Sequence, residues 1–503
     1  MDLVTTLRWA AERNPDRPAV RGTGRWLSYR EWDARTDRLA GALRSLGVER
    51  GARVGLVMHG GEQLASLHLA VQKLGAVSVP LSTRFGVEEL GYCLGDADVR
   101  LVVADAAHAE RVAAAGLGDL LRDVAAVDEL AERLDSPVCV APDESDLSVM
   151  LYTSGTTGKP KGVPRTHRAE HLAAVAHVMQ TRQRQGVATL GVMPLFHTMG
   201  LRTLLASVVV GGTWVGQPAF DADESMQLIL EENVGSLYLV PTIYWSLLRT
   251  GRLGDARALD NLAYAGAAMT PSLAEKLVDQ VAPTSFVNHF GSTEIYTFTI
   301  GPDVAAKPGC AGRAGLFSRV RLIAPDAGAP VDEEVPRGTQ GQVIVSMASP
   351  EAFGGYRNRP DANAKAIRDG WYHTGDLAVA DSDGDLWVSG RTDDMINSGG
   401  ENIYPDEIES VLTRCPAVDD VCVVGLPDER WGHAVTAFVV PVRGTDPLAA
   451  AEQALAWARE QLPSLKRPKR VIAVDSIPRS GVGKTLRRTL VAGEYDLRGE
   501  ARV

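Results

Sequence analysis

The chain has 503 residues, with 52 lysines and arginines against 63 aspartates and glutamates, which gives a formal net charge of −11. Its hydrophobic content of 45% and charged content of 23% are typical of a soluble globular protein, and its length predicts two or more domains. The acidic balance argues against a protein that binds nucleic acids or membrane surfaces.

The N-terminus and the cysteines both favour the cytoplasm. The chain begins Met-Asp-Leu, with no basic region followed by an apolar run, so no signal peptide is expected. The longest weakly polar run, residues 204–214, is too short to cross a bilayer. The five cysteines are odd in number and lack CxxC spacing, which fits a reducing compartment without disulfides or a zinc site.

Helical and strand patterns alternate through the first half of the chain. Leu39, Leu43 and Leu46 recur at helical spacing, and a second helix is expected over residues 62–74. Apolar runs predict strands, at residues 53–58, 75–81 and 100–104. This alternation predicts β-sheets covered by helices.

Proline and glycine become dense after about residue 300, and short strands are expected at 342–346 and 385–389. A self-contained pattern follows residue 391. It predicts, in order, a helix near 405–413, strands at 418–424 and 434–442, a helix at 447–461 and a strand at 470–474. These elements predict a small α+β domain of about 110 residues.

A loop rich in glycine and hydroxyl groups is the most informative segment. Residues 152–162 read YTSGTTGKPKG and follow an apolar run at 147–151. Glycines let backbone N–H groups approach an anion, hydroxyls donate hydrogen bonds and lysines neutralise charge, so the loop predicts a polyphosphate site. It is not a Walker A loop, because Thr153 stands where that pattern needs glycine and Pro160 follows Gly158-Lys159.

The loop resembles the phosphate loop of the adenylate-forming superfamily, which includes acyl-CoA and aryl-CoA ligases, peptide-synthetase adenylation domains and beetle luciferases. The resemblance continues in order along the whole chain, through PLFHTMG at 194–200, YAGAA at 264–268, FGSTE at 290–294, GYRNRP at 355–360, WYHTGD at 371–376, GRTDDMI at 390–396, SGGENIYPDEIE at 398–409 and PRSGVGK at 478–484. Further stretches at 394–403, 428–432 and 466–470 resemble benzoate-type CoA ligases, particularly those for para-substituted and halogenated benzoates.

The resemblance implies an α/β plus α+β protein in three parts. Residues 1–390 are expected to form a large adenylation domain of helix-covered sheets with a small barrel-like subdomain. Residues 391–394 are the expected hinge, and residues 395–503 the expected mobile C-terminal domain. At the hinge residue, Asp393, the small domain would swing between the two steps of the reaction.

The implied reaction joins a carboxylic acid to coenzyme A. The carboxylate attacks the α-phosphorus of ATP to give an acyl-adenylate and pyrophosphate, and the thiol then displaces AMP. ATP, Mg²⁺ and CoA are the expected cofactors and substrates. The resemblance assigns catalysis to Lys484, Glu294, Thr293 and His197, and the metal to Glu294 and Thr157. ATP and AMP are assigned to Thr153, Ser154, Gly155, Thr156, Thr157, Gly158, Lys159, Gly266, Ala267, Ala268, Phe290, Gly291, Ser292, Asp376 and Arg391.

The resemblance also implies the CoA site, and the acid pocket is assigned by position relative to the motifs. The acid pocket is assigned to His197, Thr198, Met199, Tyr244, Ala265, His289, Tyr296 and Thr297, and the CoA site to Arg84, Ser398, Gly399, Gly400, Trp431 and Arg467. Halobenzoate ligases carry apolar residues near the far end of the ring, where this chain has His289 and Tyr296. Because buried polar groups require partners, the acid is expected to be aromatic with a hydroxyl or amino substituent.

Several alternatives stay open. The chain could load the phosphopantetheine of a carrier protein, be specialised to one half-reaction, or act on an aliphatic acid. A non-catalytic relative is disfavoured, because Lys484, Glu294 and Asp376 are all present. A homodimer is also left open, and neither nucleic acid nor membrane is expected as a partner.

Overall fold

The computed structural model describes two compact units. It covers residues 1–22, 25–134, 140–153, 159–326, 328–394, 396–398, 401–403, 405–428, 431–479 and 485–502, without the side chains of residues 22, 25, 393, 397, 401, 402, 432 and 465. The first unit contains Met1–Val320 and Val345–His373, and the second contains Arg321–Ile344 and Thr374–Val503.

A six-stranded sheet of the first unit has the order β6-β5-β3-β4-β7-β8. Its strands are β3 (Arg53–Val57), β4 (Val77–Pro80), β5 (Leu101–Ala104), β6 (Leu121–Asp123), β7 (Leu147–Thr153) and β8 (Lys161–Thr166). All neighbouring strands are parallel except β7 and β8, which form an antiparallel hairpin. The three strands predicted from apolar runs before residue 105 are confirmed as β3, β4 and β5.

The second sheet of this unit has nine strands in the order β15-β14-β13-β12-β11-β9-β10-β1-β2. They are β1 (Pro18–Gly22), β2 (Arg25–Ser28), β9 (Ala188–Gly191), β10 (Thr213–Gly216), β11 (Ser236–Leu239), β12 (Asn261–Ala265), β13 (Ser285–Phe290), β14 (Thr299–Ile300) and β15 (Arg313–Ala314). The strands from β13 to β1 are parallel, and the outer strands β2, β14 and β15 pair antiparallel.

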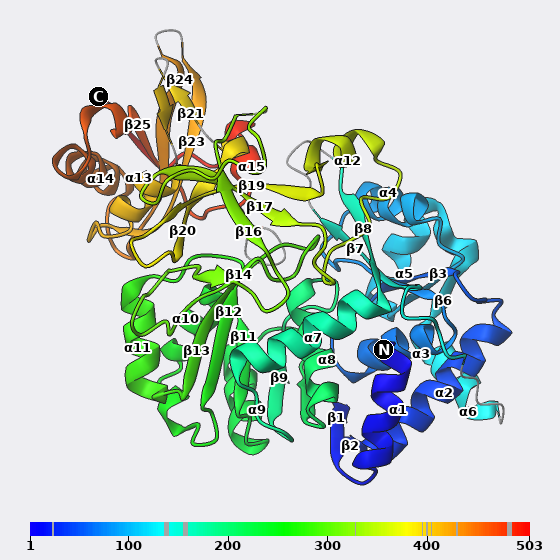
Figure 1. Cartoon of the computed structure of the whole chain (residues 1–503). Coiled ribbons are helices and arrows are strands. Elements are labelled where there is room, and N and C mark those ends of the chain that lie inside the picture. Colours follow the sequence, from blue (N-terminus) through cyan, green and yellow to red (C-terminus); the bar gives the residue numbers. More distant parts are fainter. Residues whose placement is uncertain are drawn as a thin grey trace. The chain divides into compact units, whose positions relative to one another are not determined.

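Helices cover both sheets. They are α1 (Leu3–Arg13), α2 (Tyr29–Ser45), α3 (Glu62–Lys73), α4 (Val87–Ala97), α5 (Ala106–Val112), α6 (Val124–Arg133), α7 (His167–Thr181), α8 (Thr198–Val209), α9 (Ala222–Glu231), α10 (Pro241–Arg249), α11 (Pro271–Val281) and α12 (Pro360–Ala366). Helix α7 contacts β7 and β8 of one sheet and β12 and β13 of the other, so it lies between them (Figure 1). Helix α2 begins well before its leucine repeat, because Ser28 and Glu31 form a capping box at its start.

The second unit combines a small sheet with an α+β domain. The second unit holds all of β20 (Leu386–Arg391) and most of β16 (Val320–Ile323), β17 (Gln340–Ser346) and β19 (Trp371–Ala380). Strand β18 (Ile367–Arg368) belongs to the first unit and pairs there with the start of β19. The α+β domain contains β21 (Ile396–Ser398), β22 (Glu401–Ile403), α13 (Pro405–Leu412), β23 (Val418–Asp428), β24 (Gly432–Pro441), α14 (Pro447–Gln461), β25 (Arg470–Ala473), α15 (Arg487–Val491) and β26 (Gly499–Arg502).

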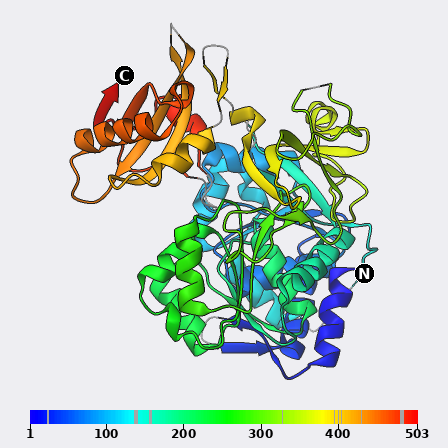
Figure 2. The same cartoon turned by 60° about the vertical axis from the view of Figure 1, so that its left-hand side comes forward.

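The two faces of the β23–β26 sheet carry different cores. Val421 and Val423 pack in the cluster that includes Ile408 of α13, whereas Cys422 and Val424 pack in the cluster that includes Leu490 of α15. This follows from the alternation of side chains along a strand. Helix α14 lies along the sheet (Figures 1 and 2) and contacts β24, β25 and β26.

The predicted fold class is confirmed: helix-covered sheets in the larger part, a small additional sheet, and a C-terminal α+β domain. The second compact unit begins earlier than residue 391, because it also takes in Arg321–Ile344 and the β19–β20 hairpin. The hinge at 391–394 and the mobility of the C-terminal domain stay predictions.

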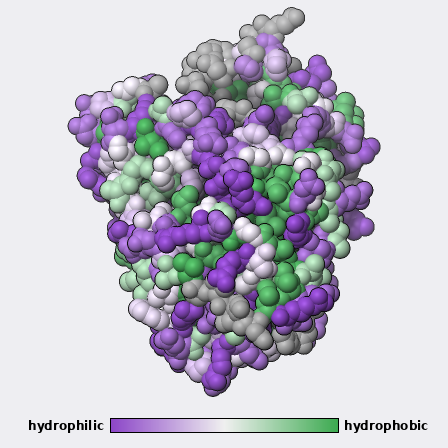
Figure 3. All heavy atoms as spheres, turned by 90° about the vertical axis from the view of Figure 1, so that its right-hand side faces the viewer, coloured by the Kyte–Doolittle hydropathy of each residue, from purple (hydrophilic) through white to green (hydrophobic). Residues whose placement is uncertain are grey.

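The described helices are each too short or too polar to cross a membrane. On the face drawn in Figure 3, hydrophilic residues are interspersed with hydrophobic ones.

Buried histidines make the stability of the first unit depend on pH. Burial lowers the pKa of His68 to about 3 and that of His167 to about 4. The unfolded chain therefore binds protons on these imidazoles at a higher pH than the folded chain does, and the free energy of unfolding falls as the pH drops below about 6.5. Each such histidine contributes about 1.4 kcal/mol per pH unit in that window.

We expect His68→Leu to remove one of these contributions. The pH dependence of the free energy of unfolding, measured by urea titration between about pH 6.5 and about pH 4.5, should become shallower than that of the wild type. An unchanged slope would contradict a neutral, buried His68 in the folded state.

Candidate active site

The β7–β8 hairpin forms the base of the predicted phosphate loop. Thr153, the last residue of β7, pairs with Lys161, the first residue of β8. Ser154, Gly155, Thr156, Thr157 and Gly158 lie outside the described residues. The Lys159 Nζ lies 5.0 Å from the ring centroid of Tyr92, and the Lys161 Nζ lies 4.3 Å from that of Tyr356. Two lysines therefore follow directly after residues 154–158, and their ammonium groups suit an anion site.

The turn that carries Thr293 and Glu294 follows β13. Gly291 begins it, and a Cβ on this residue would lie 2.1 Å from the Tyr296 carbonyl oxygen, so only glycine fits. The Glu294 side chain is buried, and its Oε1 accepts a hydrogen bond of 2.6 Å from the Tyr356 hydroxyl. Because the Tyr356 ring also contacts Lys161, it links the turn to the base of the phosphate hairpin.

A buried arginine holds the backbone of the same turn. The Arg165 Nη1 donates to the carbonyl oxygens of Thr293 at 3.2 Å and Glu294 at 3.3 Å. It also donates to the Glu351 carbonyl at 2.9 Å, and its Nε binds the Glu170 carboxylate. Arg165 lies on β8, directly after the phosphate loop. Arg165 was not predicted, because no local sequence pattern indicates contacts between residues 128 positions apart.

The predicted adenine residues lie at the carboxyl ends of two neighbouring parallel strands. Ala265 of β12 pairs with His289 of β13, so Gly266 and Phe290 follow at the same edge of the sheet. Gly266 has a φ of +86°, which glycine adopts readily. The Phe290 ring packs edge-on against Phe298, with ring centroids 5.2 Å apart. Ligands of α/β sheets bind at such edges, which fits the predicted role.

The residues assigned to the acid pocket differ in their surroundings. His197 caps α8, and its Nδ1 accepts from the Met199 N–H at 3.3 Å. Thr198 and Ala265 are half-buried, whereas Met199 is buried. Tyr244 is fully buried, and its hydroxyl donates to the carbonyl oxygens of Leu237 and Ala263. These bonds satisfy Tyr244 within the core.

The polar residues at the expected far end of the acid have protein partners. The Tyr296 hydroxyl donates to Glu170 at 3.1 Å. Arg202 donates to the His289 Nδ1 at 3.0 Å and to the Thr297 hydroxyl at 3.1 Å. Because His289 and Tyr296 have these protein partners, their burial alone does not require a polar substituent on the acid.

Three neighbours of these residues were also missed by the sequence analysis. His177 and Tyr238 lie with His289 in an aromatic cluster, with ring centroids 4.7–5.2 Å apart, and Glu351 lies 3.8 Å from the Arg202 guanidinium. Burial and then Arg202 hold the pKa of His289 well below its usual value, so the imidazole is neutral. Because a guanidinium only donates, His289 accepts at Nδ1 and carries its proton on Nε2.

The predicted ribose residues form a pair in the second unit. Asp376 of β19 lies opposite Arg391 of β20, and the Arg391 Nη1 donates to the Asp376 Oδ1 at 2.6 Å. Arg391 also donates to the Thr374 carbonyl oxygen at 3.3 Å. The structure thus brings together two residues that the sequence places 15 positions apart.

The second unit also holds most of the predicted CoA residues. The Lys469 Nζ lies 5.0 Å from the Trp431 ring centroid, which joins the segment at 428–432 to that at 466–470. The Arg467 Nε donates to the Leu462 carbonyl oxygen at 2.8 Å. Ser398 is buried in β21, and Arg84 is exposed in the first unit. Gly399, Gly400 and Lys484 lie outside the described residues, as does the side chain of Asp393.

Arg487, three residues after Lys484, is the centre of a charged cluster that the sequence analysis missed. It pairs with Asp394 at 3.5 Å, Asp406 at 2.9 Å and Glu409 at 2.8 Å. Burial raises the pKa of Glu409 to about 7, although Arg487 opposes this rise. The cluster joins the start of α15 to α13 and to Asp394, the last residue of the predicted hinge.

The buried Arg165–Glu170 pair predicts an unequal response to two arginine substitutions. Arg165→Met leaves the Glu170 carboxylate buried without its guanidinium, which costs about 3–5 kcal/mol of folding free energy. Arg133→Met breaks the exposed Arg133–Glu129 pair and should change stability little. Urea unfolding of both variants measures the difference, and equal effects would contradict this account of the buried pair.

Comparison with known proteins agrees with this arrangement. The family model described as AMP-binding enzyme matches residues 7–357, and that of the AMP-binding enzyme C-terminal domain matches residues 407–484. The chain is 37% identical to a feruloyl-CoA synthase of Amycolatopsis sp, over 95% of this chain and 96% of the relative. It is 33% identical to a 4-chlorobenzoate–CoA ligase of Arthrobacter sp, over 96% of this chain and 93% of the relative.

Solved structures agree as well. The o-succinylbenzoate CoA synthetase of Bacillus subtilis, in complex with its acyl-adenylate intermediate, superposes with a TM-score of 0.86 at 26% identity. The match covers 96% of this chain and 97% of that one. The resemblance inferred from the motifs is thereby confirmed, and the chain belongs to the AMP-binding enzyme family as an AMP-forming acid–thiol ligase of the adenylate-forming superfamily.

Proposed function

We propose that the protein activates an aromatic acid bearing an oxygen substituent and transfers its acyl group to coenzyme A. One observation carries the adenylation step: Tyr356 joins the base of the phosphate loop to Glu294, because its ring contacts Lys161 and its hydroxyl binds the Glu294 carboxylate. Cations reduce the repulsion between the acid's carboxylate and the polyphosphate, and the Glu294 carboxylate could hold a metal ion that does the same.

The ATP residues follow the predicted roles. The loop 153–159 binds the β- and γ-phosphates, and Thr293 donates to the α-phosphate. Phe290 and the backbone of Gly266 and Ala267 enclose the adenine. The other residues of the adenine site are Ala268, Gly291 and Ser292. Asp376 accepts hydrogen bonds from the ribose hydroxyls. Arg391, whose guanidinium donates to Asp376 in the structure, contacts the ribose or phosphate.

Glu294 fits a magnesium ligand. The Tyr356 phenol binds one of its carboxylate oxygens, and Mg²⁺ prefers oxygen ligands. Together with Thr157, Glu294 would hold the ion, which would neutralise phosphate charge.

Two bonds change in each half-reaction. The acid's carboxylate oxygen bonds to the α-phosphorus while the bond from that phosphorus to the pyrophosphate oxygen breaks. The deprotonated thiol then bonds to the acyl carbon while AMP leaves. Lys484 stabilises the charge in the first step, and Arg487 holds the start of the helix that follows it. Asp393 is the hinge that exchanges Lys484 for Ser398, Gly399 and Gly400.

Coenzyme A is favoured as the thiol by the Trp431 segment. The pantetheine arm would lie along Trp431, and its phosphates would meet Arg467 and Arg84. Lys469, which contacts the Trp431 ring, adds a further cation close to that arm. The relatives described above are themselves CoA ligases or synthetases.

The aromatic acid is supported by those relatives and by His289. His197, Thr198, Met199, Tyr244, Ala265, Tyr296 and Thr297 stay the other proposed pocket residues. The His289 Nε2 is buried and has no hydrogen-bond partner among the described residues. Since Nε2 carries the ring proton, it offers a donor, and a hydroxyl or ether oxygen on the acid would accept from it. An amino group is a poorer acceptor, so oxygen substituents are favoured over amino ones.

The alternatives keep distinct signatures. A loader of carrier proteins would release AMP with the carrier protein and not with CoA, and an enzyme for aliphatic acids would favour fatty acids. A cytoplasmic location and a homodimer stay predictions.

The function is tested by ATP–pyrophosphate exchange across a panel of carboxylic acids, followed by addition of CoA. We expect hydroxybenzoates to support faster exchange than aminobenzoates and fatty acids, and CoA alone to release AMP. Lys484→Ala should lower exchange by about 10²–10³-fold while still converting pre-made acyl-adenylate to the thioester. Lys365→Ala, on the exposed face of α12, is the matched control and should exchange like the wild type.

Three results would contradict the proposal. Faster exchange with fatty acids would overturn the aromatic acid, and AMP release with a carrier protein alone would overturn coenzyme A. Unchanged exchange in Lys484→Ala would overturn the catalytic lysine.

A further inference from the structure

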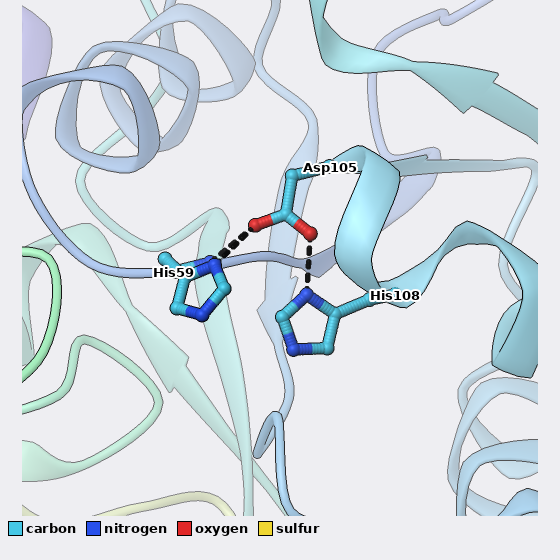
Figure 4. A group of neighbouring side chains, drawn as sticks. All are labelled: His59, Asp105 and His108. Atoms are coloured by element: carbon cyan, nitrogen blue, oxygen red, sulfur yellow. Dashed lines mark hydrogen bonds and ion pairs between the residues drawn. The ribbon is translucent and has the colours of Figure 1, made fainter.

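His59, Asp105 and His108 form a cluster in the six-stranded sheet, on residues to which the ligase chemistry assigns nothing. His59 follows β3, whereas Asp105 and His108 follow β5. The two strands are parallel neighbours, and Val57 pairs with Ala104 at their ends. The carboxyl ends of both strands therefore bring the three side chains together (Figure 4).

The cluster lies where the chain connections diverge. From β3 the chain continues through α3 to β4 on one side, and from β5 it continues to β6 on the other side. Adjacent parallel strands whose following connections run in opposite directions leave an opening between their loops, and ligands of α/β sheets bind there. Both histidines thus stand at a place that the topology leaves accessible.

Asp105 fixes both imidazoles through the same ring atom. Its Oδ2 accepts from the His59 Nδ1 at 2.7 Å and from the His59 backbone N–H at 2.9 Å, and its Oδ1 accepts from the His108 Nδ1. A carboxylate only accepts, so both Nδ1 atoms carry protons, and a metal ion would bind the Nε2 atom of each ring. Figure 4 shows the two Nε2 atoms on the side away from Asp105.

The spacing of the rings suits a shared metal ion. Their centroids lie 4.7 Å apart with an interplanar angle of 62°. An ion at about 2.0–2.1 Å from each Nε2 would lie about 3 Å from each centroid, and a tetrahedral angle would then place the centroids about 5 Å apart. The observed separation is close to that value before any ion binds.

We propose that His59 and His108 bind a divalent transition-metal ion of the Zn²⁺ type through their Nε2 atoms, with Asp105 as the residue that orients both rings. A carboxylate behind a metal-bound histidine is a common arrangement, and imidazole suits zinc and its neighbours in the transition series. His59 is about half exposed and His108 is buried, so an ion would enter from solvent and keep open positions for water or another ligand.

Zinc binding by the full-length protein tests this site. Equilibrium dialysis with Zn²⁺, in excess Mg²⁺ to occupy oxygen-ligand sites, should show one more bound zinc in the wild type than in His59→Gln. This variant changes only the exposed histidine, so the fold should persist, and circular dichroism checks that it does. Asp105→Asn should weaken zinc binding by about 10–100-fold, as loss of an orienting partner does.

His433→Gln is the matched control, because His433 is an exposed histidine of the second unit. It should bind as much zinc as the wild type. Equal zinc binding by His59→Gln and the wild type would overturn the site. Failure of the acid–CoA ligase assay would leave it standing, since the readout is bound zinc.

Discussion

A guanidinium that is taken fully out of water must find its acceptors inside the fold. Arg165 finds them in the Glu170 carboxylate and in the carbonyl oxygens of the Thr293–Glu294 turn. The strand after the phosphate loop and the turn that follows β13 are thereby fixed to each other. Tyr356 adds a bond to the Glu294 side chain from a third segment. The proposed magnesium and α-phosphate ligands are thus positioned by buried contacts.

The same buried contacts reach the proposed acid pocket. Tyr296 donates to Glu170, and its ring lies 3.6 Å from the Arg165 guanidinium. Arg202 continues the chain of contacts to His289 and Thr297. Because Tyr296 is a proposed pocket residue and also contacts Glu170 and Arg165, a substitution there would also disturb the turn that carries Glu294. This physical link between acid and nucleotide recognition suits an enzyme that must not cleave ATP without its acid.

Part of this organisation was predictable from the sequence, and the reasons differ by residue. Strands β3, β4 and β5 and the elements after residue 405 were predictable, because their hydrophobic residues form apolar runs or recur at helical or strand spacing in the local sequence. The phosphate loop carries its chemistry in its composition. Arg165, Glu170, Arg202 and Glu351 gave no such signal, because each is satisfied by segments distant in the chain and nothing local marks a charge as buried. For the same reason, the sequence suggested that His289 and Tyr296 contact the substrate, whereas in the structure both side chains bind other protein residues.

The role of the buried frame around Glu294 is tested most directly by Tyr356→Phe, which removes only the hydroxyl that binds its carboxylate. The measurement is the Mg²⁺ concentration that gives half-maximal acid-dependent ATP–pyrophosphate exchange. Loss of an orienting partner should raise it by about 10–100-fold. Tyr152→Phe is the matched control, since the hydroxyl of Tyr152 in β7 binds a different carboxylate, that of Asp96 in α4, at 2.7 Å, and the variant should leave the Mg²⁺ dependence unchanged. Equal Mg²⁺ dependence in Tyr356→Phe and the wild type would contradict the account.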